Sequence, residues 1–249
     1  MRAKTAAFAA GLALLFGTAA GAALAAQPAF VAAAVADPAR PAADTARDAN
    51  RKPAEVLAWA GVKPGDRIGE IFPGGGYYTR ILSKVVGPKG KLFLVTPSSF
   101  QEKQQKAADA LAAAVGNATV VWEAGDSPLT PEKVDVVWST DNYHDYRNPG
   151  FGPVDMAKFN KALFDSLKPG GVYIIEDYEA AAGVGATQTG THHRIESAAV
   201  KKEVEAAGFK FEGASMVLQN KADDHTLKIF DPMIRGHADQ YVLKFRKPK

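Results

Sequence analysis

The chain has 249 residues, of which 47% are apolar and 23% are charged, and its formal net charge is +3. This composition is typical of a globular protein and excludes a disordered or membrane-embedded chain. The sequence contains no cysteine, which excludes disulfides, thiol catalysis and cysteine-bound metals. Its basic residues form no stripe, so we expect no nucleic-acid partner.

Residues 1–25 have the features of a signal peptide. Arg2 and Lys4 form a basic start, an apolar run follows, and residues 23–25 have the small-residue pattern of a cleavage site. We therefore expect an exported, periplasmic protein with no stable membrane insertion after cleavage. The alternative is an uncleaved anchor helix, because the apolar run approaches the length that spans a bilayer.

Residues 26–47 are rich in Ala and Pro and show no sustained period, so we predict a linker. Residues 48–249 have the length of one α/β domain. Apolar runs predict strands at 67–72, 91–96, 118–124, 134–140, 172–176, 209–218 and 240–246. Cap and stop residues predict helices at 53–60, 77–86, 98–115, 156–167 and 196–207.

This alternation predicts a doubly wound, mostly parallel seven-stranded sheet in a single domain. The last two predicted strands have only an irregular segment between them, residues 219–239. We therefore expect them to pair antiparallel at one edge of the sheet.

The strand-to-helix turn at 70–79 has the sequence Glu-Ile-Phe-Pro-Gly-Gly-Gly-Tyr-Tyr-Thr. Three glycines let the backbone come close to a ligand, and Glu70 closes the strand before them. The combination predicts a nucleoside-cofactor site at the carboxyl end of the first strand. The alternative for Glu70 is a strand-end carboxylate that pairs with Arg51 or Arg67.

Segments throughout the domain support one resemblance, namely 62–66, 74–79, 142–145, 167–171, 193–194, 207–209 and 241–246. They resemble the class I S-adenosylmethionine-dependent methyltransferases, and among them an exported bacterial branch of predicted methyltransferases. The resemblance implies a Rossmann-like fold, S-adenosylmethionine as cofactor and in-line methyl transfer to an acceptor. The acceptor, which we expect to be a small molecule, and the oligomeric state stay open.

The family's cofactor loop usually has an acid followed by three alternating glycines. Here this register gives Glu70, Phe72, Gly74 and Gly76, so a phenylalanine replaces the first glycine. Its ring narrows the space for the methionine part of the cofactor unless it turns into the core. Thr96 stands where most relatives have an acid for the ribose hydroxyls, and loss of that charged pair costs about 1–3 kcal/mol of affinity.

The resemblance also implies that Gly75, Tyr77 and Asn142 lie in the cofactor site and that Asp126 binds the adenine amino group. A nicotinamide dinucleotide is the rival cofactor, but Thr79 stands at the third glycine of that fingerprint. A non-catalytic periplasmic module that binds a small molecule or a protein is a further alternative. The altered loop favours such a module, and so does the cytoplasmic origin of the methyl donor.

Residues 141–145, Asp-Asn-Tyr-His-Asp, follow the fourth predicted strand. His144 has an ordinary pKa suited to a general base, Asp145 can orient it or act alone, and Tyr143 can stack on the adenine or the acceptor. The alternative is a capped turn that holds a half-buried histidine bonded to the backbone.

A glycine-rich stretch, 183–190, leads into Thr-His-His-Arg and can form a lid over the site. His193 and Arg194 are candidates for acceptor binding, the arginine through a carboxylate or phosphate. A surface ion pair is the alternative for Arg194. His192 and His193 are adjacent and cannot easily chelate one ion, and no third ligand is evident, so we predict no metal site.

Overall fold

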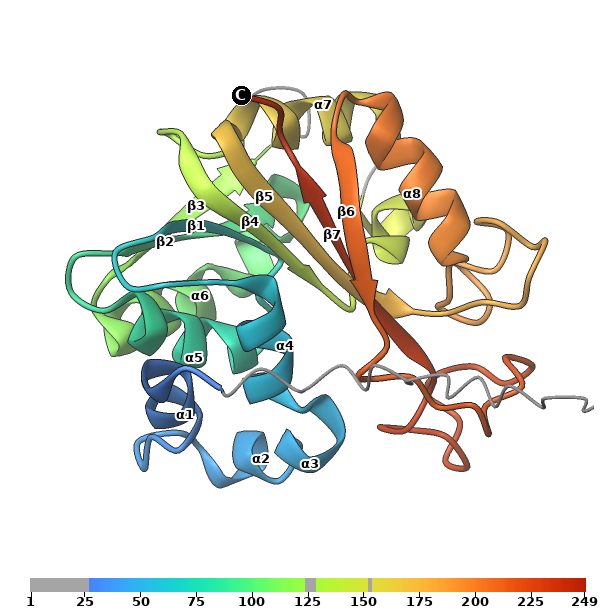
Figure 1. Cartoon of the computed structure of the whole chain (residues 1–249), viewed down its shortest axis with the longest axis horizontal. Helices are drawn as coiled ribbons and strands as arrows, with labels where there is room; N and C mark the ends of the chain where they lie inside the picture. Colours follow the sequence, from blue (N-terminus) through green and yellow to red (C-terminus); the bar gives the residue numbers. More distant parts are fainter. Residues whose placement is uncertain (1–26, 124–128, 152–153) are drawn as a thin grey trace, which may run out of the picture.

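The structure is a computed structural model that describes residues 27–249 apart from 124–128 and 152–153. The predicted signal peptide and Asp126 therefore lie outside the described residues. One central sheet has helices on both faces (Figure 1). Within the described ranges, no helix is both long and apolar enough to span a bilayer.

Seven strands form the sheet in the order β3-β2-β1-β4-β5-β7-β6. They are β1 Arg67–Ile71, β2 Lys91–Pro97, β3 Ala118–Glu123, β4 Val134–Thr140, β5 Leu167–Tyr178, β6 Lys210–Ser215 and β7 Gln240–Arg246. Strands β1 to β5 run parallel to one another. Strand β7 runs antiparallel to both β5 and the edge strand β6. The predicted mostly parallel α/β sheet with an antiparallel pair at one edge is confirmed.

Strand β2 illustrates how the sheet builds two cores. Leu92 and Leu94 belong to one cluster of buried side chains, and Phe93 and Val95 belong to the cluster on the opposite face. Successive side chains of a strand point to opposite faces, and all four are fully buried. A strand that is covered on both sides is therefore a continuous apolar run, which is why the sequence predicts it well.

The longer helices cover the two faces of the sheet, with α4 to α6 on one side and α7 and α8 on the other (Figure 1). They are α4 Pro53–Ala60, α5 Tyr77–Val86, α6 Gln101–Val115, α7 Met156–Ser166 and α8 Ser197–Ala206. Three short 3-10 turns follow strand ends: η1 Ser98–Phe100, η2 His144–Arg147 and η3 Pro149–Phe151. Because these turns follow β2 and β4, they lie at the carboxyl edge of the sheet.

The predicted linker at 26–47 is helical and packed in the part that the structure describes, which begins at residue 27. It forms α1 Ala29–Val35 and α2 Ala42–Thr45, which lead into α3 Asp48–Arg51. These helices lie below α4 and α5 (Figure 1). Val31 and Ala34 are buried in the core. The segment has few large apolar residues, so its sequence shows no clear helical period. The side chains of Val31 and Ala34 nevertheless pack α1 against the core.

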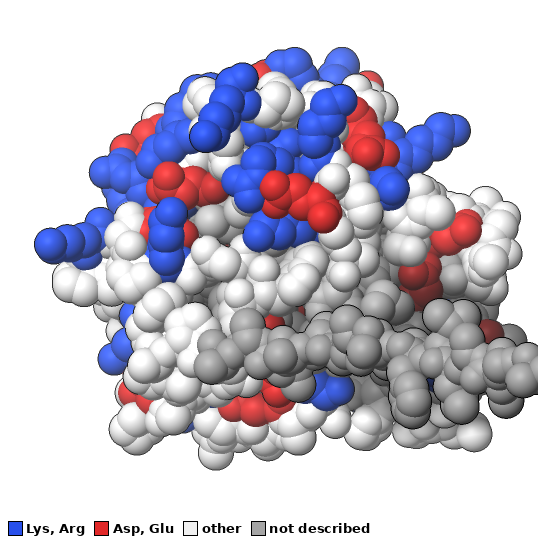
Figure 2. All heavy atoms as spheres, in the orientation of Figure 1, with Lys and Arg blue, Asp and Glu red and all other residues white. Residues whose placement is uncertain are grey.

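Lys and Arg side chains gather in the upper part of Figure 2, near the C-terminal end of the chain, with Asp and Glu among them. At this end of the sheet, Arg246 donates to Glu212 at 2.8 Å and Lys168 to Asp135 at 2.8 Å. The carboxyl ends of the parallel strands, where the predicted site lies, are at the opposite end of the molecule (Figure 1).

Candidate active site

A pocket of about 250 Å³ opens at the carboxyl ends of β1 and β4. The chain continues from β1 to β2 on one side, and β4 lies on the other. In open α/β sheets this reversal of strand order is where ligands bind. The pocket is lined by the end of β1, the glycine turn, the start of α5, the end of β4 and two arginines, Arg47 and Arg51.

The glycine turn forms an open wall of the pocket. Gly74 and Gly75 line it, and a Cβ on either would meet no heavy atom within 4 Å. Gly76 differs, because a Cβ there would lie 2.5 Å from the side chain of Leu111. Gly74 and Gly75 therefore line the pocket. Gly76 does not line it and instead allows α5 to pack closely against Leu111 of α6.

Glu70 ends in the pocket as a buried carboxylate. The residue is 4% exposed, and its Oε2 has no hydrogen-bond partner among the described residues. Burial raises the pKa of Glu70 to about 7, although Thr79 and Arg80 favour the charged form. The alternative pairing with Arg51 or Arg67 is wrong, because both arginines bind other carboxylates. This buried oxygen needs a cationic or hydrogen-bonding group to balance its charge when Glu70 is ionised.

Phe72 stands at the position of the missing glycine with φ +46°. Its ring centroid lies 4.9 Å from that of Phe100 and 4.9 Å from that of Phe151. One side of the ring packs on the core beneath α7, and the residue also lines the pocket. The ring is thus a wall of the pocket, which stays open beside it.

The remaining predicted cofactor residues divide into two groups. Asn142 and Tyr77 line the pocket. Asn142 donates to the Ile71 carbonyl at 2.7 Å and accepts from Ser139 at 2.6 Å, so it joins the ends of β1 and β4. Thr96 is 2% exposed within β2 and does not line the pocket, because its side chain lies in the interior of the molecule.

An arginine at the end of α3, Arg51, closes one side of the pocket. Arg51 pairs closely with Asp141, and its Nη2 lies 3.4 Å from Glu176 Oε1. Tyr78 donates to the second oxygen of Glu176 at 2.8 Å. Burial raises the pKa of Glu176 to about 8, although Arg51 opposes the rise. This charged wall is missing from the sequence prediction, which considered Arg51 only as a partner of Glu70.

A second pocket, of about 340 Å³, shares Arg47, Arg51 and Asp141 with the first. Its other walls include Asn50, Tyr178 and the segment between β6 and β7 with Phe230. Phe230 is 55% exposed. The predicted lid at 183–190 does not line either pocket, and the segment before β7 takes that place.

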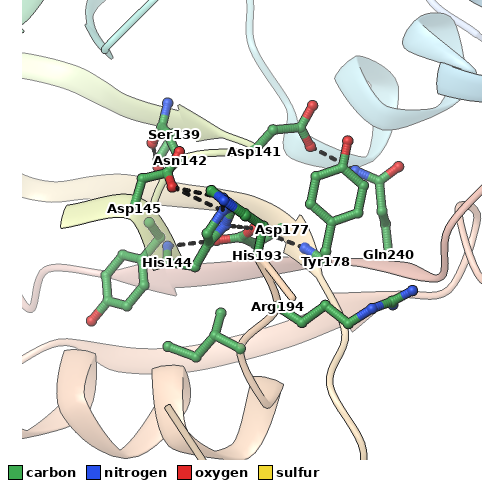
Figure 3. Close-up of polar contacts among 12 residues, drawn as sticks. Ser139, Asp141, Asn142, His144, Asp145, Asp177, Tyr178, His193, Arg194 and Gln240 are labelled. Atoms are coloured by element: carbon green, nitrogen blue, oxygen red, sulfur yellow. Dashed lines mark hydrogen bonds and ion pairs between the residues drawn. The ribbon is translucent and has the colours of Figure 1, made fainter. Parts of the chain in front are cut away.

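His144, Asp145 and His193 come together beside the first pocket, and Asp145 lines it. His144 Nε2 lies 3.2 Å from Asp145 Oδ1 and 3.2 Å from His193 Nδ1. His193 Nδ1 is 3.1 Å from the same Asp145 oxygen. On the other side of the ring, His144 Nδ1 lies 2.7 Å from Asp177 (Figure 3).

Without another cation at Nε2, the neighbouring carboxylates favour the protonated form of His144. Burial alone would lower its pKa, but Asp177 and Asp145 outweigh burial and raise the pKa to about 10. A protonated imidazole cannot accept a proton, so the geometry does not favour the predicted base. The alternative of a half-buried histidine is also wrong, because His144 is 1% exposed and bonded to side chains.

Tyr143 is a core residue and not a stacking platform. It is 1% exposed, its hydroxyl donates to Glu203 at 2.9 Å, and Asn160 donates to that hydroxyl at 2.8 Å. The η2 turn directs the ring toward α7 and α8, away from the pocket. The prediction that Tyr143 stacks on a ligand is therefore wrong.

Arg194 is fully buried and has structural partners. It donates to the carbonyls of Glu179 at 2.9 Å and Leu227 at 3.0 Å, and to Asp223 at 2.8 Å. Both predictions for Arg194, an acceptor contact and a surface ion pair, are wrong. The guanidinium instead fastens the segment between β6 and β7 to the end of β5. His193 keeps a place near the pockets, with its ring centroid 4.9 Å from that of Phe230.

No protein-family profile matches the sequence, and no curated protein matches it. Solved structures are similar in fold. A SAM-dependent methyltransferase from Aquifex aeolicus has a TM-score of 0.57 and 19% identity, over 81% of this chain and 92% of that chain. The N-methyltransferase NodS from Bradyrhizobium japonicum has a TM-score of 0.54 and 13% identity, over 83% of this chain and 99% of that chain.

The [4+2]-cyclase SpnF is similar to the same degree, with a TM-score of 0.56 and 17% identity, over 83% of this chain and 82% of that chain. At these identities the likeness establishes the fold. The chain has the α/β Rossmann-like fold of the class I S-adenosylmethionine-dependent methyltransferases.

Proposed function

We propose that this chain is an exported methyltransferase that binds S-adenosylmethionine in the pocket between β1 and β4. One observation carries the proposal: an open glycine turn, Gly74–Gly75, adjoins Glu70, whose buried Oε2 has no hydrogen-bond partner among the described residues. The likeness of fold to a SAM-dependent methyltransferase supports the same cofactor. Export and a periplasmic location rest on the signal-peptide features of residues 1–25 alone.

The pocket suits the amino-acid end of this cofactor. The free oxygen of Glu70 would accept a hydrogen bond from its ammonium group, and the turn gives its backbone room to approach. Arg47, whose half-exposed side chain also pairs with Asp44, lines the pocket and would bind the carboxylate. The bound cofactor supplies a methyl group on a cationic sulfur, which leaves as a neutral thioether.

We place the acceptor in the second pocket, which adjoins the first at Arg51 and Asp141. Tyr178 and the exposed Phe230 offer aromatic contacts there, which favours an acceptor with an apolar body. The task of the chain in this arrangement is to hold the acceptor in line with the methyl group and to keep water out.

The second candidate is a small-molecule binding module without methyl transfer. Thr96 is buried, so β2 offers no acid to ribose hydroxyls at the pocket, and Phe72 forms part of its wall. The fold also belongs to a protein described as a cyclase. An exported enzyme, moreover, needs a supply of a donor that is made in the cytoplasm.

Calorimetric titration with S-adenosylmethionine and S-adenosylhomocysteine tests the cofactor assignment. We expect saturable binding that the Glu70→Gln variant weakens about 10-fold or more, because a charge-assisted hydrogen bond is lost. Glu132→Gln is the matched control, since the Glu132 side chain is 39% exposed and pairs with Arg67 away from the pocket. Absence of heat with both ligands at millimolar concentration contradicts the proposal.

Transfer of a labelled methyl group to components of a periplasmic extract separates the two candidates. Transfer that depends on Glu70 supports the enzyme. Ligand binding without any labelled product favours the binding module.

A further inference from the structure

Three polar atoms beside the first pocket form a small triangle. His144 Nε2, His193 Nδ1 and Asp145 Oδ1 are 3.1 to 3.2 Å from one another. Atoms that bind one transition-metal ion at about 2.0–2.2 Å lie about 2.8–3.6 Å apart in octahedral or tetrahedral geometry. The observed separations fall within that range, so the three atoms are spaced as the ligands of one ion would be.

The orientation of the two rings favours a shared ion. The His144 and His193 rings are nearly perpendicular, with an interplanar angle of 89°. One nitrogen of each ring lies close to the same Asp145 oxygen (Figure 3). The rings approach at their edges and therefore converge without a steric conflict.

Neighbouring side chains hold two of the three groups in place. Asp177, which is fully buried, accepts the backbone N–H of His144 at 2.9 Å and lies 2.7 Å from its Nδ1. This contact leaves Nε2 directed at the triangle, as in the carboxylate–histidine–metal arrangement of known metal sites. Asn148 donates to Asp145 Oδ1 at 2.7 Å and fixes that carboxylate.

One side of the triangle is accessible. The side chains of His193 and Asp145 are 29% and 21% exposed, whereas that of His144 is 1% exposed. Asp145 lines the first pocket, and the His193 ring contacts Phe230 of the second. An ion held here would be reached from the pockets, and its free positions would accept water or an oxygen of a bound molecule.

We infer that His144, Asp145 and His193 form a binding site for a divalent first-row transition-metal ion. Two imidazoles and a carboxylate favour such an ion over magnesium or calcium. The sequence analysis considered the adjacent His192 and His193 and predicted no metal site. The structure brings in His144, 49 residues away, and its neighbour Asp145. This site is independent of the proposed function, because it requires neither the methyl donor nor an acceptor.

Titration of the tag-free protein with Co²⁺, followed by visible absorption, tests the site. We expect the wild type to saturate at one equivalent. His193→Asn removes a ligand while keeping a residue that tolerates the left-handed backbone at this position, where φ is +54°. His193→Asn and Asp145→Asn should each weaken binding about 100-fold or more, and Asp177→Asn about 10- to 100-fold.

His192→Asn is the matched control, because His192 is the same residue type one position away and lies outside the triangle. Its Co²⁺ affinity should equal that of the wild type. Thermal melts by circular dichroism establish that each variant is folded. A wild type that shows no saturable Co²⁺ spectrum, or a folded His193→Asn variant with unchanged affinity, overturns the inference. Titration of the same variants with S-adenosylhomocysteine separates loss of the metal site from loss of the proposed cofactor site.

Discussion

Arg51 and Asp141 form an ion pair between the two pockets, although 90 residues separate them in the chain. Asp141 follows β4 with φ +56°, a backbone conformation that directs it back toward the N-terminal helices. Gln240 at the start of β7 donates to its second oxygen at 2.6 Å. The pair therefore joins three distant parts of the chain and forms part of the wall between the two pockets.

Replacement of Arg51 by Met should lower the free energy of unfolding by about 3 kcal/mol, because the buried Glu176 and the half-buried Asp141 lose their cation. The double variant Arg51→Met/Asp141→Asn should recover part of this loss. Urea unfolding of both proteins measures the difference. Arg67→Met is the control, since that arginine is 41% exposed and should cost less than about 1 kcal/mol. Equal effects at the two arginines would contradict the structural role of Arg51.

The effect of Glu70 on the free energy of unfolding should depend on pH. Burial raises its pKa from 4.5 to about 7 in the folded chain, so the folded form binds the proton more tightly. Its contribution to stability is full below pH 4.5 and is lost as the pH rises to 7. Glu70→Gln should therefore raise the free energy of unfolding by about 2–3 kcal/mol at pH 8 and by less than about 1 kcal/mol at pH 5. Urea unfolding at both pH values measures this, and a pH-independent gain would exclude the raised pKa.

Ligand affinity should rise with pH, whereas the contribution of Glu70 to stability falls. A cationic ligand group pairs with the ionised form of Glu70, whose population rises about tenfold between pH 6 and pH 8 for a pKa near 7. The association constant for S-adenosylhomocysteine should rise by a similar factor over this range. Calorimetry at several pH values tests the expectation, and Glu70→Gln should abolish the dependence. A parallel pH profile in both proteins would assign the effect to another group.

Much of the fold follows from local pattern. The buried run at 134–140 and the glycine turn at 74–76 coincide with β4 and with the start of α5. The segment at 28–47 departs from expectation because its burial depends on Val31 and on alanines, which give no strong amphipathic signal. Tertiary contacts decide the structure there.

The site is less predictable because its polar partners are remote in sequence. Glu70 and Gly74 belong to one local motif, so sequence pattern finds them. The meeting of His144 with His193, and of Arg194 with Asp223, depends on how the chain returns to the carboxyl edge of the sheet. The segment with Asp223 has a loop-like composition, and only the fold reveals that this carboxylate is buried.

Arg194→Lys should destabilise the protein by about 2–3 kcal/mol, because a lysine cannot donate to three separated acceptors at once. Ligand affinity of the folded variant should equal that of the wild type. Urea unfolding and S-adenosylhomocysteine titration on the same preparation measure the two quantities. Unchanged stability with weakened ligand binding would indicate that Arg194 contacts the ligand.

The most direct test is S-adenosylhomocysteine titration of a Gly75→Val variant. Gly75 lines the pocket, and a Cβ there meets no heavy atom within 4 Å, so the variant should fold and melt like the wild type. Gly213→Val is the control, because Gly213 lies on the edge strand β6, where a Cβ has only ordinary contact with Trp59. The account predicts that Gly75→Val abolishes binding and that Gly213→Val preserves it. Wild-type affinity in a folded Gly75→Val protein would contradict the assignment of this pocket to the cofactor.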